Sequence, residues 1–535
     1  MWVLGINWEW HDTAAALVDG EGRVVACAEE ERFTRVKHAW DSFPVGAAAH
    51  CLATAGIDWQ DLDVVAVGWD IPHSNLWHFP ERDRRLLLSA LFGPKVGARV
   101  DSRRPEVVFV EHHVAHALSS FHASGFERAG VLVVDGSGEF YGTSIYAADR
   151  LAAPRPLRHW HRGFSLGALY EATTRSLGMG ILDAGKTMGL ASYGADGTEP
   201  LPLGDVLGDG PSFFGRHPRT KYQTIVDDWM GHLAQRFGAV ATDSHGLAHD
   251  PAAVAMAAAA QRTVEIAMHD LHAETRRLSG YSRVCLAGGV ALNSVVNGQL
   301  PEPLYIPPFP HDAGVALGAA WSVRPPASAG LLASPYLGAA VGELAGAGLE
   351  TDGLVGTPFT PEAVTELLIR GRIGAIAEGR AEYGPRALGH RSIVALPHDR
   401  GMRDRLNAVK RREAWRPFAP VTLPDYASRL WPRQGLRELY MIGNAVVSEH
   451  GLDVMPAAVH VDGTTRPQVL QPGAAPTLES LLEALRAAGM PPVLVNTSFN
   501  GPGEPIVNTA ADAVRSFREL GLDFLVLGDS LILPR

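Results

Sequence analysis

The sequence predicts an α/β protein with two domains, the first of them internally duplicated. Three observations support this prediction. The chain has 535 residues, more than the roughly 250 to 300 that a single hydrophobic core supports. A short apolar strand, a polar turn and a second strand occur twice, over residues 3–18 and 130–147. Helical and strand patterns alternate elsewhere, which is typical of α/β architecture.

The first domain is predicted from these hairpins and the elements around them. In the second hairpin the turn is rich in glycine, which allows close approach of a ligand. A further glycine turn at Gly288–Val290 follows a strand, so we expect another ligand-facing loop there. Hairpin strands are predicted over 3–6, 14–18, 130–134 and 142–147, other strands over 64–69 and 284–287, and helices over 43–55, 111–120 and 251–279.

The second domain is predicted to begin after a change of composition. From about Val323 to Thr357 the chain is rich in Pro, Gly, Ala and Ser, which favours a linker. We therefore place the boundary near Gly356, giving domains over 1–355 and 356–535. Beyond it, a helix is expected over 361–370 and strands over 373–377, 493–495 and 524–527.

Composition excludes several classes of protein. Hydrophobic residues make up 46% and charged residues 20%, so we expect the whole chain to fold. The net charge of −11 argues against a nucleic-acid-coating protein. Cys27, Cys51 and Cys285 lie far apart, which predicts neither disulfides nor a thiolate zinc site. With no basic leader pattern and no apolar run of roughly 18 residues, we expect a cytoplasmic protein without a membrane partner.

A metal site is predicted in the first domain. His112 and His116 are four residues apart, so on a helix both imidazoles project from one face. Asp135 ends a strand in a glycine-rich turn, and Asp312 precedes a predicted helix. Two imidazoles and two carboxylates suit Fe(II), Mn(II) or Zn(II). The alternatives are histidines that only form hydrogen bonds and aspartates that cap helices or turns.

A basic segment marks the second domain. Residues 378–420 contain many arginines and few acidic residues. Guanidinium groups match phosphate oxygens in bidentate fashion, which indicates a pocket for phosphorylated small molecules. The alternative is a solvated basic face.

These segments, taken together, resemble the NodU and cephamycin-type O-carbamoyltransferase family over nearly the full chain. The resemblance is specific because several motifs occur in the same order as in the family, which is stronger evidence than any single motif. They are His11-Asp12, Glu29 to Arg35, His112 to His116, Val134-Asp135-Gly136, Gly185 to Leu190, Ala287 to Asn293 and Asp312 to Val315.

The resemblance implies an actin-like ATPase (ASKHA) fold for the first domain, shared with threonylcarbamoyl-transferring tRNA-modification proteins. It also implies that His112, His116, Asp135 and Asp312 bind a divalent metal, Fe²⁺ first, with Mn²⁺, Zn²⁺ and Mg²⁺ as alternatives. His11 matches a family histidine beside the reaction centre, although from the residues alone it is equally a solvent-exposed turn residue. The adenylate-binding residues implied are Lys186, Gly288, Gly289 and Asn293.

For the second domain, the resemblance implies an α/β fold related to the threonylcarbamoyl-adenylate synthases, which activates carbamoyl groups with ATP. His390 stands where some relatives have glutamine. The residues implied to hold phosphates are Arg386, Lys410, Arg416 and Arg466, and those implied to contact the ligand are Asn496 and Ser498.

The function expected is ATP-dependent O-carbamoyl transfer. Carbamoyl phosphate and ATP would give carbamoyl-adenylate, and His11 would deprotonate a hydroxyl of a natural-product or sugar acceptor, giving a carbamate ester and AMP. One alternative is a metal-dependent hydrolase or amidase, which leaves the basic segment without a role. Another is a nucleotide-sensing RNA-binding module, which the acidic charge disfavours. The acceptor, the role of residues 76–104 and the oligomeric state, including a homodimer, stay open.

Overall fold

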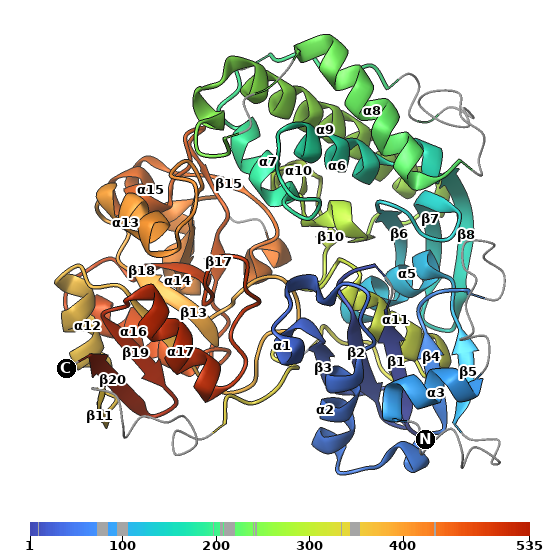
Figure 1. Cartoon of the computed structure of the whole chain (residues 1–535), viewed down its shortest axis with the longest axis horizontal. Coiled ribbons are helices and arrows are strands. Elements are labelled where there is room, and N and C mark those ends of the chain that lie inside the picture. The colour runs from blue at the N-terminus through green and yellow to red at the C-terminus, as the bar shows by residue number, and fades with distance from the viewer. Residues whose placement is uncertain are drawn as a thin grey trace. The chain divides into compact units, whose positions relative to one another are not determined.

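The computed structural model describes residues 1–8, 10–71, 84–93, 105–195, 197–203, 207, 220–238, 240, 243–332, 334–342, 354–432 and 435–534. Its contacts divide the chain into two compact units (Figure 1). The first comprises residues 1–296 and 300–337, and the second comprises 297–299 and 338–535. Of segment 76–104, only α3 (Arg84–Phe92) and the residue that follows it lie within the described part. None of the described helices combines the length and apolar character of a membrane span.

The first unit contains two five-stranded sheets with the same strand order. In each sheet three strands pair antiparallel, and the last two run parallel to the innermost of these three. This repeat confirms the predicted duplicated, actin-like α/β fold. The orders are β3 (Val24–Glu29), β2 (Ala14–Val18), β1 (Val3–Asn7), β4 (Val64–Val67), β5 (Glu106–Phe109), and β8 (Ala152–His161), β7 (Tyr141–Asp149), β6 (Arg128–Val134), β9 (Val284–Ala287), β10 (Leu304–Tyr305).

Helices on both faces keep the first sheet buried. α2 (Val45–Ala55) packs on one face and α11 (Ala313–Val323) on the other. α11 also packs closely against α5 (His112–Ala123) at Gly318. A Cβ added at Gly318 would lie only 1.8 Å from the Ala115 carbonyl oxygen. This close approach brings the start of α11 to the face of α5 that carries the predicted metal ligands.

Capping explains the long helix of the first unit. α9 (Pro251–Ser279) has the predicted bounds. It starts after Asp250, whose carboxylate accepts hydrogen bonds from the Ala252 and Ala253 amides, and it ends at Gly280 in a left-handed conformation. Helices that the sequence did not predict are α6 (Leu166–Ser176), α7 (Ala184–Ala191) and α8 (Tyr222–Phe237).

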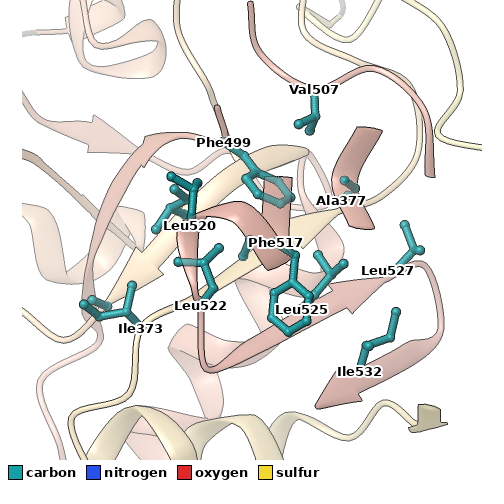
Figure 2. Packing of buried hydrophobic residues seen from close by; sticks show 14 of the residues in the cluster. Ile373, Ala377, Phe499, Val507, Phe517, Leu520, Leu522, Leu525, Leu527 and Ile532 are labelled. Atoms are coloured by element: carbon teal, nitrogen blue, oxygen red, sulfur yellow. The ribbon is translucent and has the colours of Figure 1, made fainter. Parts of the chain in front are cut away.

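The second unit is an eight-stranded mixed sheet covered by helices. Its core includes Phe499, Phe517, Leu525 and Ile532 (Figure 2). The strand order is β11 (Leu354–Pro358), β20 (Ser530–Pro534), β19 (Phe524–Leu527), β12 (Gly374–Ala377), β13 (Arg391–Ala395), β18 (Val493–Ser498), β14 (Ala419–Thr422) and β17 (Gln468–Val469). The main helices are α12 (Pro361–Ile369), α13 (Gly401–Val409), α14 (Pro424–Leu430), α16 (Pro476–Ala487) and α17 (Ala510–Leu520).

The second unit begins at Gly338, earlier than the expected boundary near Gly356. Backbone hydrogen bonds explain the difference, since the Gly338 amide donates to Ala381 and the Val341 amide to Gly379. β11, which lies partly inside the expected linker, pairs along its length with β20. The composition of this stretch, rich in small residues and prolines, therefore predicted a linker where the chain already belongs to the second unit.

Candidate functional site

Four side chains of the first unit converge on one buried point. The Nε2 atoms of His112 and His116, one turn apart on α5, lie 3.2 Å from each other. Asp135 follows β6, and its Oδ2 lies 3.3 Å from His112 Nε2 and 3.8 Å from His116 Nε2. Asp312 precedes α11, and its Oδ1 lies 3.6 Å and 3.4 Å from the same nitrogens. All four are buried, and we call them the His–Asp cluster.

Neighbouring groups orient the donor atoms of this cluster. His112 Nδ1 lies 3.2 Å from the Gly68 carbonyl oxygen, so an Nδ1–H donated to it leaves the Nε2 lone pair directed into the cluster. Trp69 stacks on the His112 ring at 3.9 Å. The Gly289 amide donates to Asp135 Oδ1 at 2.9 Å, which leaves Oδ2 facing the histidines. Contacts from the protein itself therefore orient His112 and Asp135 within the cluster.

The residues present fit a divalent cation. Donors that share one ion at about 2.0 to 2.2 Å lie roughly 3 to 3.6 Å from one another, close to the 3.2–3.8 Å separations seen between these nitrogens and oxygens. Burial lowers the pKa of His112, but Asp312 and Asp135 outweigh it and hold that pKa well above its usual range. Two nitrogen and two oxygen donors suit Fe²⁺, Mn²⁺ or Zn²⁺ better than Ca²⁺ or Mg²⁺, which prefer oxygen alone.

His11 lies in the β1–β2 turn and is oriented by Asp12. His11 Nδ1 lies 3.0 Å from Asp12 Oδ2, and the other oxygen of Asp12 lies 2.8 Å from His38 Nδ1. Burial lowers the pKa of His11, but the hydrogen bond to Asp12 and the charges of Asp12, Asp312 and Asp135 raise it to about 9. Because Nδ1 is engaged, Nε2 is the atom that can meet a substrate.

The predicted adenylate-binding residues fall into two groups. Gly288 and Gly289 lie against the Asp135 turn, since a Cβ on Gly288, whose φ is +93°, would lie 2.3 Å from the Val134 carbonyl oxygen. Asn293 instead caps α10 (Ser294–Gln299) and hydrogen-bonds Gln261 at 2.9 Å. Lys186 on α7 forms an ion pair with Asp183 at 3.0 Å. The glycines are thus beside the cluster, whereas Asn293 and Lys186 have protein partners.

Four arginines of the second unit lie close enough together for their charges to lower the pKa of three of them, Arg386, Arg412 and Arg466. Burial and the charges of Arg386, Arg412 and Arg416 lower the pKa of Arg466 well below its usual range. Burial and Arg416 lower the pKa of Arg386 to about 10. Within the described part of the chain, the buried Nε atoms of Arg386 and Arg466 have no hydrogen-bond partner. These four residues, called the arginine cluster, have one carboxylate among them within the described ranges, Glu413 at 3.5 Å from Arg416, and therefore form a site of net positive charge suited to an anion.

Arg412 was not singled out from the sequence, although it lies in the basic segment. It stacks over Phe418 with its guanidinium carbon 4.0 Å from the ring centroid, and its Nε donates to Asn407. Burial and the charge of Arg416 lower the pKa of Arg412 well below its usual range. Lys410, Arg411 and Arg412 are three successive basic residues, and nothing in the sequence separated Arg412 from the other two.

The remaining predicted ligand-binding residues contact protein groups. Lys410 Nζ donates to the Ser498 carbonyl oxygen at 2.5 Å and to Asn500 Oδ1 at 3.1 Å. Asn496 donates to Gln468 at 2.7 Å, while its buried Oδ1 has no partner within the described part. Ser498 Oγ donates to Asn500 at 2.7 Å. Lys410 and Ser498 therefore hold the loop after β18, and Asn496 retains one free acceptor.

Two further residues support the arginine cluster. His390 joins two segments, with Nδ1 2.6 Å from the Arg380 carbonyl oxygen and Nε2 3.0 Å from that of Ala474. Oε1 of the buried Glu382 accepts hydrogen bonds from the backbone amides of Leu388, His390 and Arg391. Glu382 fixes the loop that carries Arg386, and no local pattern in the sequence marked it for this role.

Comparisons with known proteins match the two parts of the chain to two family models. The family model described as Carbamoyltransferase N-terminus matches residues 2–78 and 87–321, and the one described as Carbamoyltransferase C-terminus matches 365–533. Nodulation protein NolNO of Sinorhizobium fredii (strain NBRC 101917 / NGR234) is 33% identical, over 98% of this chain and 79% of that protein. Nodulation protein NolO of Bradyrhizobium diazoefficiens (strain USDA 110) is 34% identical, over 80% and 79%.

Among solved structures, the activator of the 2-hydroxyisocaproyl-CoA dehydratase from Clostridium difficile with bound ADPNP is similar at 12% identity and a TM-score of 0.34. The match covers 60% of this chain and 94% of that one. Values this low have no bearing on chemistry.

Proposed function

The chain belongs to the carbamoyltransferase family, and on that premise we propose that it is an ATP-dependent O-carbamoyltransferase that works through carbamoyl-adenylate. The observation that carries the proposal is the presence of two sites of different chemistry. The arginine cluster suits carbamoyl phosphate and ATP, both of which are anions. The His–Asp cluster, with His11 in the same unit, suits transfer to a hydroxyl.

We propose that the second unit forms the adenylate. Water cleaves carbamoyl phosphate to carbamate and phosphate. A carbamate oxygen then attacks the α-phosphorus of ATP, forming an O–P bond while pyrophosphate leaves with the electrons of the broken bond. The arginine cluster stabilises the negative charge of the phosphoryl groups in this step. Asn496, with its free buried oxygen, is proposed to accept a hydrogen bond from the carbamoyl NH₂ group.

We propose that the first unit transfers the carbamoyl group. The acceptor oxygen attacks the carbamoyl carbon, its proton passes to His11 Nε2, and the bond between carbon and the AMP oxygen breaks, giving a carbamate ester and AMP. Asp12 holds the His11 ring and stabilises the imidazolium. A divalent ion held by the His–Asp cluster, proposed to be Fe²⁺, would supply Lewis-acid polarisation. Gly288 and Gly289, which pack against Val134 and Asp135 beside the His–Asp cluster, are proposed to border the nucleotide.

The half-reactions give a direct test. Purified protein is incubated with ATP and carbamoyl phosphate, and pyrophosphate is measured without an acceptor and AMP with one. We expect His112→Ala to abolish AMP release while pyrophosphate release continues, and Arg416→Ala to abolish pyrophosphate release. Equal loss of both half-reactions in both variants would contradict the division of labour. Cleavage of amides without nucleotide consumption would favour a metal-dependent hydrolase instead.

A further inference from the structure

Asp12 meets two imidazole rings, one at each oxygen of its carboxylate. Its Oδ2 lies 3.0 Å from His11 Nδ1, and its Oδ1 lies 2.8 Å from His38 Nδ1. Both partners of the second contact are largely shielded, since the side chain of His38 is 25% exposed and that of Asp12 is 11% exposed. A carboxylate that meets a base through one oxygen can still rotate, and a donor on its second oxygen removes that freedom.

The backbone around His38 is fixed without help from its ring. His38 follows α1 (Glu31–Thr34), its amide donates to Glu31 at 2.7 Å, and its carbonyl oxygen accepts from the Asp12 amide at 2.7 Å. The Thr13 hydroxyl donates to the Ala39 carbonyl oxygen at 3.2 Å. These contacts already join the loop to the β1–β2 turn, so the imidazole of His38 can be removed without breaking them.

The conformation of His38 shows which substitutions this position accepts. Its φ is +64° and its ψ is 0°, a region where glycine is unstrained and asparagine is tolerated better than most other residues. Asparagine also carries a side-chain N–H donor close to where histidine carries Nδ1. Glycine therefore removes the donor and keeps the backbone, whereas asparagine keeps both.

We propose that His38 is a positioning residue for the base. By donating to Asp12 Oδ1 it fixes the carboxylate, which in turn holds the His11 ring by Nδ1 and leaves Nε2 for the acceptor. The inference rests on the proposed function, in which His11 takes the proton of the acceptor hydroxyl. His38 touches no reacting atom, so its removal should slow transfer and leave the formation of carbamoyl-adenylate in the second unit unchanged.

The ring N–H protons test this positioning without any ligand. Downfield ¹H NMR spectra are recorded on protein labelled with ¹⁵N-histidine, and the His11 Nδ1–H signal is identified as the one lost in His11→Gln. We expect this signal, protected from exchange with water, in the wild-type protein and in His38→Asn. In His38→Gly it should broaden or vanish, because the Asp12 carboxylate can then rotate away. A purely structural role of His38 would leave the signal unchanged in both variants.

Turnover gives a second readout, with ATP, carbamoyl phosphate and glycerol as the hydroxyl probe. In His38→Gly the kcat of AMP release should fall on the order of tenfold, part of the roughly 10²- to 10⁴-fold that a positioned base contributes, with KM for glycerol unchanged. His38→Asn should stay within about threefold of the wild-type rate. Pyrophosphate release should be the same in all three proteins.

A double-mutant cycle shows whether His38 acts through Asp12. Asp12 also has a positive φ, of 53°, so Asp12→Gly removes the carboxylate without straining the backbone. In that background His38→Gly should slow AMP release no further, because the two residues act as one unit.

Three results would overturn the positioning role. They are the absence of a protected His11 N–H signal in the wild-type protein, equal behaviour of the glycine and asparagine variants, and additive losses from His38→Gly and Asp12→Gly. Thermal unfolding checks that each variant is folded. If the His11 signal responds as expected but the wild-type protein releases no pyrophosphate, the proposed function fails while the positioning by His38 stands.

Discussion

At the scale of single residues, the proposed role of His11 as the base predicts how the rate of transfer depends on pH. Its raised pKa of about 9, against an ordinary value of 6.5, means that the imidazole is mostly protonated at neutral pH in the metal-free protein. A cation in the His–Asp cluster would oppose the carboxylate charges of Asp135 and Asp312 and lower that pKa. We therefore expect the acceptor-dependent rate to rise with pH, with an apparent pKa between 6.5 and 9.

Replacing Asp12 changes this profile in a defined direction. In Asp12→Asn the largest remaining influence on His11 is burial, which lowers its pKa. The rising limb of the pH–rate profile should move to lower pH, and the maximal rate should fall about tenfold or more because the base is weaker and less well oriented. AMP release measured from pH 5 to 10 checks this. An unmoved limb would show that another group titrates.

Without a bound anion the arginine cluster lowers the stability of the folded protein, and replacing a single arginine measures this effect. Arg466 is buried among three other guanidinium groups that lower its pKa. Replacing it with methionine, which has a similar length and no charge, should stabilise the ligand-free protein by on the order of 1 kcal/mol and weaken ATP binding at least tenfold. Thermal unfolding in phosphate-free buffer, with and without ATP, measures both effects. A less stable ligand-free variant would contradict the argument.

At the scale of elements, the sequence predicted the four residues of the His–Asp cluster but not the residues that support them. His112 and His116 were predicted because helical spacing is local, and Asp135 and Asp312 because each stands at the end of a predictable element. Glu139, which accepts hydrogen bonds from the Asp70 and His112 amides, gave no such signal. A carboxylate that binds distant backbone amides has no fixed spacing from them, so only the folded chain shows the partnership.

Helix packing gives a prediction at the same scale. Gly318 on α11 faces the Ala115 carbonyl of α5, and a Cβ there would lie 1.8 Å from that oxygen. Gly318→Ala should separate the helices, move Asp312 away from the histidines and cost about 2 kcal/mol of stability. Its affinity for Zn²⁺, measured by competition with a chelator, should fall about 10- to 100-fold.

The control is another glycine within a helix. Gly231 lies in α8, where an added Cβ meets nothing within 4 Å. Gly231→Ala should leave Zn²⁺ affinity unchanged and add up to about 1 kcal/mol of stability through better helix propensity. Similar Zn²⁺ affinities in the two variants would show that α11 packing does not position Asp312.

At the scale of the whole molecule, the duplication was predictable because each hairpin has its own strand–turn–strand pattern. β8 escaped prediction because only one of its residues is buried and it includes two prolines, and its identity as a strand comes from pairing with β7. The start of the second unit at Gly338 escaped because its contacts with Gly379 and Ala381 are distant in sequence. Local sequence patterns thus predicted the elements that have buried faces. The elements that form through hydrogen bonds to distant parts of the chain could not be predicted from such patterns.

The two-site organisation leads to a prediction for the whole chain. A ligand that binds only the folded state stabilises it by about 2.7 kcal/mol at a hundredfold excess over its dissociation constant. In hydrogen-exchange mass spectrometry, Zn²⁺ should therefore slow exchange in α5 and α11, whereas ATP with carbamoyl phosphate should slow exchange around Arg386 and Arg416 in the second unit. In His112→Ala only the first protection should disappear, and in Arg466→Met only the second should weaken. If Zn²⁺ protected the second unit, or if ATP with carbamoyl phosphate left the peptides around Arg386 and Arg416 unprotected, the assignment of activation and transfer to separate units would be wrong.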